Sequence, residues 1–331
     1  MGTSIWQKLK KDNHMKSIMV TGCAGFIGSH VCERLLEQGY QVVGLDNFDP
    51  FYPKAVKERN MEGFRTHSNF SFYEIDLRKE IPVNQIEENV DLIIHLAGKA
   101  GVRPSIDDPK SYIDSNITAT QNILTYMREK SIKKMAFASS SSVYGNTESV
   151  PFQEDSKLDE PISPYAFTKK SCELLNHTYH HLYDFDIINL RFFTVFGPRQ
   201  RPDLAIHKFL RLMREGKSIP VFGDGTTARD YTYIEDTVSG IIQACHYLDT
   251  HQSVYETINL GNCFPVLLSE LIEVLGKEAK VETLINRLPM QAGDVKQTYA
   301  DISRAEKLIG YKPQVSFAEG IKRFVKWFDC N

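Results

Sequence analysis

The residues best suited to acid–base chemistry are Tyr165 and Lys169, which lie four positions apart in the run Ser163–Lys170. Apolar residues recur with helical spacing through Leu175, so the run predicts a helix, and residues i and i+4 share one helix face. A tyrosine loses its proton near pH ~10, and a neighbouring ammonium group lowers that pKa. The pair could therefore act as a general acid/base on a hydroxyl or carbonyl group. Taken alone, the spacing is common by chance and favours a surface tyrosine stacked on a lysine stem.

A second group of residues points to a bound dinucleotide. A short apolar strand at 17–20 leads into a turn with Gly22, Gly25 and Gly28, and a helical pattern and a second strand end at Asp46. Such glycines let the backbone approach a pyrophosphate, whose charge rests on the helix N-terminus. Asp46 is placed to accept a hydrogen bond from a ribose 2′-hydroxyl, and its charge repels a 2′-phosphate, so NAD is favoured over NADP. The alternative is a turn that merely closes a βαβ unit, but the register of strand, helix and acid favours the dinucleotide.

The elements that must position these residues alternate along the first half of the chain. Further strands are predicted at 70–77, 90–98, 134–139 and 186–191, with a helix at 114–127. This alternation predicts an α/β fold with a doubly wound parallel sheet of the Rossmann type. It ends near residue 190, which predicts a Rossmann domain at 17–190 (plus about 232–262) and a smaller mixed α/β C-terminal substrate lobe at 191–231 and 263–331. Helices are predicted at 203–217, 235–247, 268–276, 303–309 and 317–328.

Polar side chains follow two of the predicted strands. Asp76 ends the strand at 70–77, where it could meet an adenine amino group or, with equal weight, cap a loop. The strand at 134–139 runs into Ser140, Ser141 and Ser142. Parallel sheets bind ligands at the carboxyl ends of their strands, so these hydroxyls predict a substrate site rather than a serine-rich turn.

Composition excludes several other classes of function. The 331 residues carry a net charge of −3, which indicates no general affinity for nucleic acid. No apolar run approaches the ~18 residues of a membrane span. The six cysteines are scattered without a C-x-x-C pair, which predicts free thiols and a cytoplasmic location. His177, His180 and His181 share a helical face, but no carboxylate or cysteine completes a set of ligands, so no metal site is predicted and a solvated face or a subunit contact is favoured. Residues 1–16 form a polar extension.

Together these motifs resemble the extended short-chain dehydrogenase/reductase superfamily, and within it the NAD-dependent epimerases and dehydratases of nucleotide sugars. The general resemblance rests on the glycine turn, Asp46, the serines after residue 139 and the Tyr165–Lys169 pair. More specific stretches resemble the UDP-glucuronate 4-epimerases. They are Ala100–Arg103, Ala138–Gly145, Arg191–Val195, Gly197–Asp203 and Leu288–Val295.

The resemblance implies a tightly held NAD and a catalytic group of Tyr165, Lys169 and Ser140. Tyr165, assisted by Ser140, would take the proton of the sugar 4-hydroxyl as a hydride passes from C4 to NAD. The 4-keto sugar would then rotate and take the hydride back on its other face. The implied cofactor-binding residues are Gly22, Gly25, Phe26, Ile27, Gly28, Asp46, Asn47, Asp76, Leu77, Leu96, Ala97, Lys99, Ser139, Tyr165 and Lys169.

The implied substrate is a UDP-sugar, most closely UDP-glucuronate, which would be converted to UDP-galacturonate. Departures from related enzymes support an acidic sugar. Ser141 and Ser142 stand where 4,6-dehydratases have Asp-Glu, and Ser142 also stands where the decarboxylases have Glu. Thr194 stands where galactose-type epimerases have Asn. Arg201 could then bind the sugar carboxylate with these hydroxyls, unless it only bonds its own proline-rich loop or a partner subunit. Arg103 and Ser140 are further implied substrate contacts. Val221 and Phe222 would lie at uracil, and Arg229 and Asp294 at the diphosphate and ribose.

Two alternatives stay open at this point. The first is a 4-epimerase of another UDP-hexose, either UDP-glucose or UDP-N-acetylglucosamine. The second is an NAD-sensing protein on the same fold without turnover, because a fold does not determine a function. The resemblance also implies a homodimer, in which the helix before Met127 and the Tyr165 helix pack into a four-helix bundle.

Overall fold

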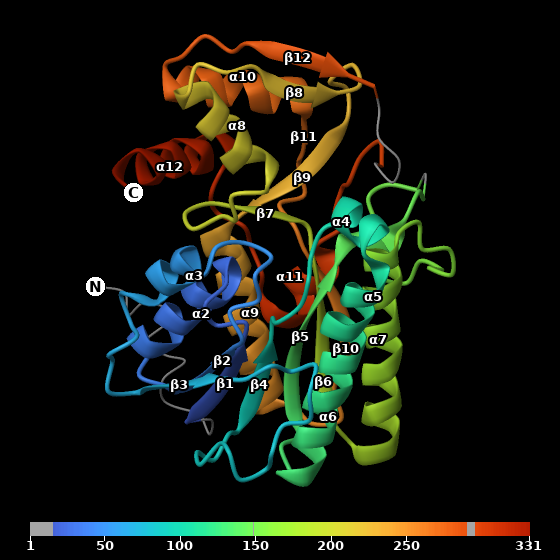
Figure 1. Cartoon of the computed structure of the whole chain (residues 1–331). Coiled ribbons are helices and arrows are strands. Elements are labelled where there is room, and N and C mark those ends of the chain that lie inside the picture. Colours follow the sequence, from blue (N-terminus) through green and yellow to red (C-terminus); the bar gives the residue numbers. More distant parts are fainter. Residues whose placement is uncertain (1–15, 148, 290–294) are drawn as a thin grey trace, which may run out of the picture.

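The computed structural model describes residues 16–147, 149–289 and 295–331. Figure 1 shows a lower part built around one large sheet and an upper part that carries two small sheets. The upper part also contains α8 (Ala205–Arg214), α10 (Leu268–Ala279) and α12 (Phe317–Cys330). A single apolar cluster extends from α2 below into these three helices, so the two parts share one core.

The large sheet has seven parallel strands in the order β10-β6-β5-β4-β1-β2-β3. They are β1 (Ser17–Thr21), β2 (Gln41–Asp46), β3 (Phe70–Glu74), β4 (Leu92–His95), β5 (Lys134–Ser140), β6 (Asp186–Phe192) and β10 (Tyr255–Leu260). Side chains alternate between two core clusters, since Ile18 and Val20 belong to one and Met19 to the other. The predicted doubly wound parallel sheet is confirmed.

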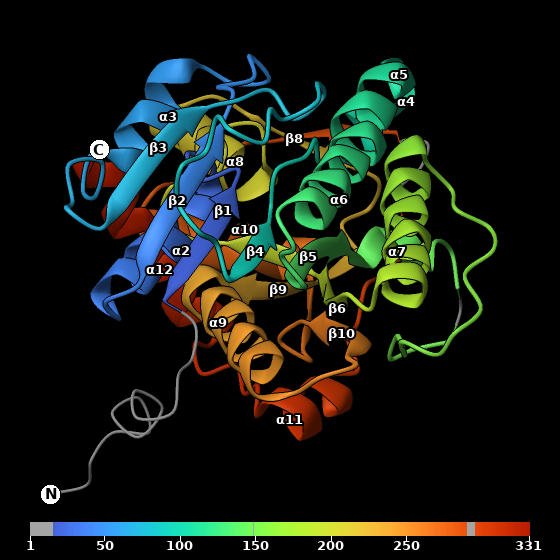
Figure 2. The same cartoon turned by 90° about the horizontal axis from the view of Figure 1, so that it is seen from below.

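Helices cover both faces of this sheet, as seen from below in Figure 2. One face packs against α2 (Phe26–Glu37) and α9 (Ile234–Thr250), with α3 (Lys54–Met61) beside α2 and α11 (Ser303–Ile309) beside α9. The other face packs against α6 (Ala119–Glu129) and α7 (Pro164–Tyr183). Because both faces are covered, strands such as β1 and β4 are mostly apolar, whereas β6 and β10 also bury polar residues such as Asn189 and Asn259.

The upper part is built on two small sheets. One has three strands in the order β11-β9-β7, with β7 (Thr194–Phe196), β9 (Ala228–Tyr233) and β11 (Pro265–Leu267). The other pairs β8 (Ile219–Phe222) with β12 (Ile285–Leu288) in parallel. β7 begins two residues after β6 ends, so the large sheet leads directly into the upper part.

Several predicted boundaries are wrong, because local contacts override the sequence pattern. The strand predicted at 70–77 ends at Glu74, which leaves Asp76 in the following turn. The helix predicted at 114–127 is part of a longer helical stretch: α5 (Pro109–Tyr112) leads into a π-helix, η1 (Ile113–Thr118), which continues as α6, and the short helix α4 (Val102–Asp107) comes before them. The serine turn forms a short 3₁₀-helix, η2 (Ser141–Tyr144). The predicted helix at 203–217 is shorter, at Ala205–Arg214.

Candidate active site

A cavity of about 350 Å³ opens where the strand order reverses, at the carboxyl ends of β1 and β4. Doubly wound sheets bind ligands at this switch point. The cavity wall includes all fifteen residues expected at the cofactor, and also Ser140, Thr194 and Arg201 from the substrate set. The fold therefore brings together, in one cavity wall, expected residues from eight separate segments of the chain.

The glycine turn leaves room for a ligand against the backbone. Gly22 has φ +71°, a conformation that favours glycine. A Cβ on Gly28 would lie 2.1 Å from the Gly22 carbonyl oxygen, so only glycine fits at that position. Gly25 caps α2 without a side-chain hydrogen bond, so the helix N-terminus offers its N–H groups to the cavity. This geometry fits a pyrophosphate at the turn.

Asp46 is buried at the end of β2 and already has backbone partners. Its carboxylate accepts hydrogen bonds from Ala24 N–H at 3.2 Å and Phe48 N–H at 2.8 Å. Burial raises its pKa, and the ammonium of Lys57, 3.8 Å away, opposes that rise. Lys57 also lines the cavity, although no sequence pattern had indicated it.

Asp76 reaches the same cavity from the turn after β3. Arg78 bonds it through Nε and Nη2, at 2.7 Å for the shortest contact, and this hydrogen bonding lowers the pKa of the carboxyl group. The carboxylate is therefore ionised and held in one orientation. A contact of Asp76 with adenine stays a prediction.

The catalytic candidates come from the facing ends of α7 and β5. Tyr165 and Ser140 are both buried, and the two side chains share a hydrogen bond. Lys169 is buried one turn after Tyr165, and its ammonium donates to the Ala138 carbonyl oxygen at 2.7 Å. The predicted i,i+4 neighbourhood is confirmed, and the alternative of a surface tyrosine is wrong.

The predicted effect of Lys169 on Tyr165 is wrong. Burial raises the pKa of the Tyr165 phenol, and the influences that oppose it are the Ser140 hydrogen bond and the charge of Arg201. The pKa of Lys169 is itself lowered by burial, against the charges of Cys172 and Glu173. The ammonium is directed at strand β5, which sequence spacing cannot reveal. The phenol therefore rests as a neutral proton donor.

Arg201 lies in the cavity wall, and its guanidinium already makes hydrogen bonds within the protein. Nε and Nη2 bind the two oxygens of Asp203 at 3.0 and 2.7 Å, and Nη2 also donates to the Ala100 carbonyl oxygen at 3.2 Å. The guanidinium lies 4.9 Å from the centre of the Phe51 ring. Arg201 thus bonds its own loop and also lines the cavity, and a contact with a sugar carboxylate stays a prediction.

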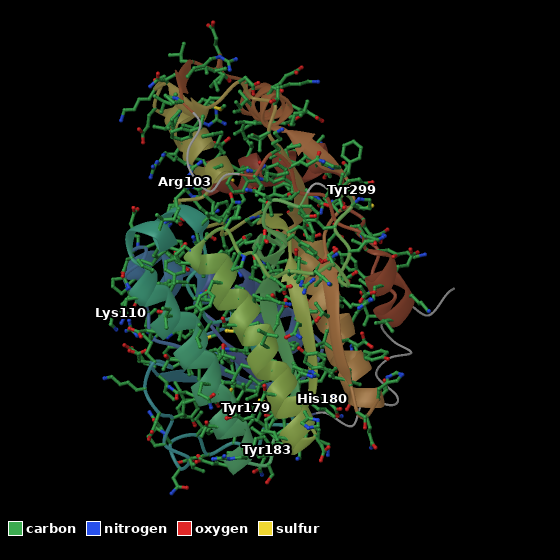
Figure 3. All side chains as sticks on the ribbon, turned by 90° about the vertical axis from the view of Figure 1, so that its right-hand side faces the viewer. Arg103, Lys110, Tyr179, His180, Tyr183 and Tyr299 are labelled. Carbon is green, nitrogen blue, oxygen red and sulfur yellow. The ribbon has the colours of Figure 1, made fainter. Side chains whose placement is uncertain are left out.

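Other residues of the expected substrate set lie outside the cavity wall. Ser141 and Ser142 belong to η2, and Ser140 Oγ bonds Ser142 Oγ at 3.2 Å. Figure 3 shows Arg103 on α4, at the end of the lower part that faces the upper part. Its guanidinium lies 4.8 Å from the Phe222 ring centre, which links the two parts. The remaining members are Val221, buried in β8, and Arg229, which donates to its neighbour Ala228 O, while Asp294 falls outside the described residues.

Asn116 is a buried residue that holds part of the cavity wall in place and that sequence patterns did not indicate. It stands in the π-helix η1, and its amide bonds both the N–H and the carbonyl of Lys99, at 2.8 and 3.0 Å. It also donates to Thr168 Oγ1 at 2.9 Å, which ties the turn after β4 to α7. A Cβ on Gly98 would lie 2.8 Å from the Asn116 amide oxygen, so the contact requires glycine there. Single π turns are frequent at functional sites.

Within residues 16–147, 149–289 and 295–331, no group of three or more His, Cys, Asp or Glu side chains is arranged to hold a metal ion. In the same part of the chain no helix has both the length and the apolar character that crossing a membrane requires.

Comparison with known proteins identifies the family of the chain. Residues 19–324 match the family model described as GDP-mannose 4,6 dehydratase. The UDP-glucuronate 4-epimerase of Thermodesulfobacterium geofontis is 46% identical, over 95% of this chain and 96% of that protein. The crystal structure of UDP-glucuronic acid 4-epimerase from Bacillus cereus, in complex with UDP-glucuronic acid and NAD, has a TM-score of 0.90 at 38% identity, over 95% and 99% of the two chains.

A more distant structure, UDP-glucose 4-epimerase of Thermotoga maritima with UDP-glucose, has a TM-score of 0.86 at 29% identity, over 95% of this chain and 99% of that one. The family model spans nearly the whole described chain and the relatives are covered almost in full. The chain therefore belongs to the GDP-mannose 4,6-dehydratase family, within the extended short-chain dehydrogenases/reductases.

Proposed function

We propose that this protein is an NAD-dependent UDP-glucuronate 4-epimerase that interconverts UDP-glucuronate and UDP-galacturonate. The observation that carries the proposal is one cavity whose wall contains the glycine turn, Tyr165, Ser140 and Arg201. The relatives named above with this activity are also more similar to this chain than the UDP-glucose enzyme is.

The residues of the turn and of the strand ends fit NAD. The N–H groups at the start of α2 face the place of a pyrophosphate, and Asp46 is placed for the adenosine ribose. The buried carboxylate disfavours a 2′-phosphate, although Lys57 at 3.8 Å partly offsets its charge. When bound, NAD accepts the hydride of the sugar C4 and later returns it to the opposite face.

In this proposal Tyr165 exchanges the proton of the sugar 4-hydroxyl. Burial keeps the phenol protonated, so Tyr165 is ready to donate to a 4-keto oxygen. In the oxidative direction the phenol must first ionise, and the Ser140 hydrogen bond and the Arg201 charge favour that form. Lys169 holds the end of β5 through Ala138 O, which keeps Ser140 beside Tyr165.

Arg201 gives the site its selectivity for an acidic sugar. Oxidation at C4 of a glucuronate produces a β-keto acid, which loses CO₂ when the breaking bond lies perpendicular to the carbonyl plane. A guanidinium presents donors in a fixed plane and can hold a carboxylate away from that alignment. Thr194 lines the same cavity. Ser141 and Ser142 stand one and two residues beyond Ser140 and complete the proposed carboxylate contacts.

The uridine end is proposed to lie towards the upper part. Arg103, Phe222 and Val221 would meet uracil, and Arg229 with Asp294 would meet the diphosphate and ribose. The Arg103–Phe222 contact supports this assignment, because it places a cation and an aromatic ring together at the boundary of the two parts. The division into a Rossmann domain and a substrate lobe at the boundaries given above is part of the same proposal, as is a cytoplasmic location.

We further propose a homodimer formed by α6 and α7. Phe167, Leu174 and Leu182 are 46%, 59% and 59% exposed and follow one face of α7 at spacings of seven and eight residues. α6 and α7 lie side by side in Figures 2 and 3, with Tyr179 and Tyr183 towards the C-terminal end of α7. An exposed apolar stripe along a surface helix such as α7 marks a candidate interface.

A substrate comparison tests the proposed function. Purified protein is incubated without added NAD with UDP-glucuronate, UDP-glucose or UDP-N-acetylglucosamine, and the 4-epimers are separated by chromatography. We expect UDP-glucuronate to give the highest kcat/KM, and acid denaturation of the protein to release NAD. Preferential conversion of UDP-glucose would favour the hexose epimerase, and no conversion of any sugar would favour the NAD-sensing protein.

A further inference from the structure

The first turn of α7 has one N–H donor that its own residues do not satisfy. Helix starts leave such donors unpaired, but Pro164 has no N–H, and Ser163 accepts from Ala166 N–H through Oγ at 3.1 Å and from Phe167 N–H through its carbonyl at 3.0 Å. The remaining donor is Tyr165 N–H, which bonds Ser105 Oγ at 3.1 Å. Ser105 belongs to α4, 60 residues earlier in the chain.

Ser105 is arranged so that it can only accept this bond. Its side chain is fully buried, and its hydroxyl proton goes to the Val102 carbonyl oxygen at 2.5 Å. A hydroxyl has one proton and two lone pairs, so the lone pairs remain for Tyr165 N–H. A buried donor without a partner is costly, and the bond therefore sets the spacing between α4 and α7.

The α4 segment, residues 100–107, also contacts groups that we propose to bind substrate. Ala100 O accepts from Arg201 Nη2 at 3.2 Å, and Arg103 lies over the Phe222 ring. Tyr112, just beyond the segment, donates to Ala100 O at 3.3 Å and meets the Tyr165 ring edge to face, with ring centres 6.1 Å apart. The segment thus lies between the proposed substrate contacts and the catalytic helix.

We propose that Ser105 is a positioning residue that sets the place of the Tyr165 phenol through the Tyr165 backbone. The inference rests on the proposed function, in which Tyr165 exchanges the substrate proton. Ser140 belongs to β5, which is not bonded to Ser105. A shift in the first turn of α7 therefore changes the distance between the Tyr165 and Ser140 hydroxyls. Misplacement of a reacting group by about 1 Å can cost ~100-fold in rate.

Kinetics of Ser105 variants test the proposal. Ser105→Ala removes the acceptor, and we expect kcat for UDP-glucuronate to fall roughly tenfold to hundredfold while KM and the retained NAD stay within about twofold. Ser105→Thr keeps the hydroxyl and should recover most of the lost turnover. The matched control is Ser111→Ala on α5, which removes an exposed hydroxyl bonded to Asp108 O and should leave all these quantities unchanged.

Amide hydrogen exchange gives a readout that does not depend on turnover. In Ser105→Ala, exchange at Tyr165 should become about tenfold faster, while Ala166, capped by Ser163, keeps its protection. If the parent protein does not convert UDP-glucuronate, the proposed function fails but the exchange result still reports the contact. The proposal would be overturned if Ser105→Ala had the same kcat and the same amide exchange rate at Tyr165 as the parent protein. It would also be overturned if Ser105→Ala had a lower Tm but the same kcat per NAD-loaded molecule.

Discussion

At the scale of single residues, the site depends on a phenol that burial holds in its neutral form. Tyr165 is 8% exposed, and its pKa is raised despite a hydrogen bond and a cation that oppose the rise. A general acid should be protonated before it acts, and a general base must be able to lose that proton. The same residue has to do both in a reversible epimerisation, so the groups around it matter as much as the residue itself.

The first prediction concerns the phenol hydroxyl. Tyr165→Phe keeps the ring and its packing but removes the exchanging proton, and turnover should fall by about 10²–10⁴-fold. The variant should fold and keep its NAD, because the ring is retained and the other expected cofactor contacts are unchanged. The measurement is kcat with UDP-glucuronate, beside the NAD content of the purified protein. Parental rates would remove Tyr165 from the mechanism.

The second prediction concerns the guanidinium of Arg201. In Arg201→Ala the charge-assisted bonds to the sugar carboxylate are lost, worth about 1.5–3 kcal/mol each, or roughly 10–150-fold in affinity. The Kd of UDP-glucuronate should rise by that factor and the Kd of UDP-glucose should not change. Isothermal titration with both nucleotides measures the difference, and release of CO₂ from UDP-glucuronate would show that the β-keto acid is no longer held.

Turnover of Arg201→Ala needs a separate interpretation. The Arg201 charge lowers the pKa of Tyr165, so its removal raises that pKa further and slows proton exchange with every sugar. Binding is therefore the quantity that reports the carboxylate contact. Equal affinity of parent and variant for UDP-glucuronate would place the carboxylate site elsewhere.

At the scale of elements, strands and their ends were predictable, whereas contacts between distant segments were not. The buried strands and the acid or hydroxyl that follows each one appear as local patterns, and they place Asp46, Ser140 and Tyr165 around one cavity. The π-helix with Asn116 and the bond from Tyr165 N–H to Ser105 have no local pattern. Both depend on packing across more than fifty residues, which a single sequence does not display.

Strand β4 ends at a buried histidine that ties three elements together. Thr120 Oγ1 donates its proton to Asn116 O at 2.6 Å and can therefore only accept from His95 Nε2. This leaves Nδ1 of the neutral ring to accept the Thr21 hydroxyl proton at 2.7 Å. His95 Nε2–H then donates to Thr120 Oγ1 at 3.2 Å. The imidazole is therefore neutral, and burial lowers its pKa to about 3, with the charge of Lys169 acting in the same direction.

The third prediction follows from this depressed pKa. Between pH ~6.5 and ~3 the unfolded chain binds a proton at His95 and the folded chain does not, so acid favours unfolding throughout that window. At pH 5 the cost is about 2 kcal/mol. His95→Gln should therefore show a smaller drop in the urea midpoint between pH 7 and pH 5 than the parent. His67→Gln, at an exposed position, is the matched control and should keep the parental drop. An unchanged pH dependence in His95→Gln would contradict the prediction.

At the scale of the whole molecule, the exposed stripe on α7 predicts the oligomeric state. Leu174→Glu with Leu182→Glu places charges in the proposed helix bundle, and the protein should sediment as a monomer where the parent is a dimer. Leu267→Glu, on an apolar residue of β11 that is 44% exposed, is the matched control and should leave the dimer intact. Analytical ultracentrifugation at equal protein concentration makes the comparison. A parent that sediments as a monomer would exclude the proposed dimer.

The place of β10 in the sheet has a consequence for synthesis. β10 pairs with β6, but the chain between them, residues 193–254, first builds β7, β8, β9, α8 and α9. While the chain is still being translated, the finished β6 has an open edge until residue 260 has emerged from the ribosome. At about 5–20 residues per second that interval lasts several seconds. An open strand edge recruits other chains, so a ribosome stalled before β10 would release a fragment whose β6 edge is unpaired.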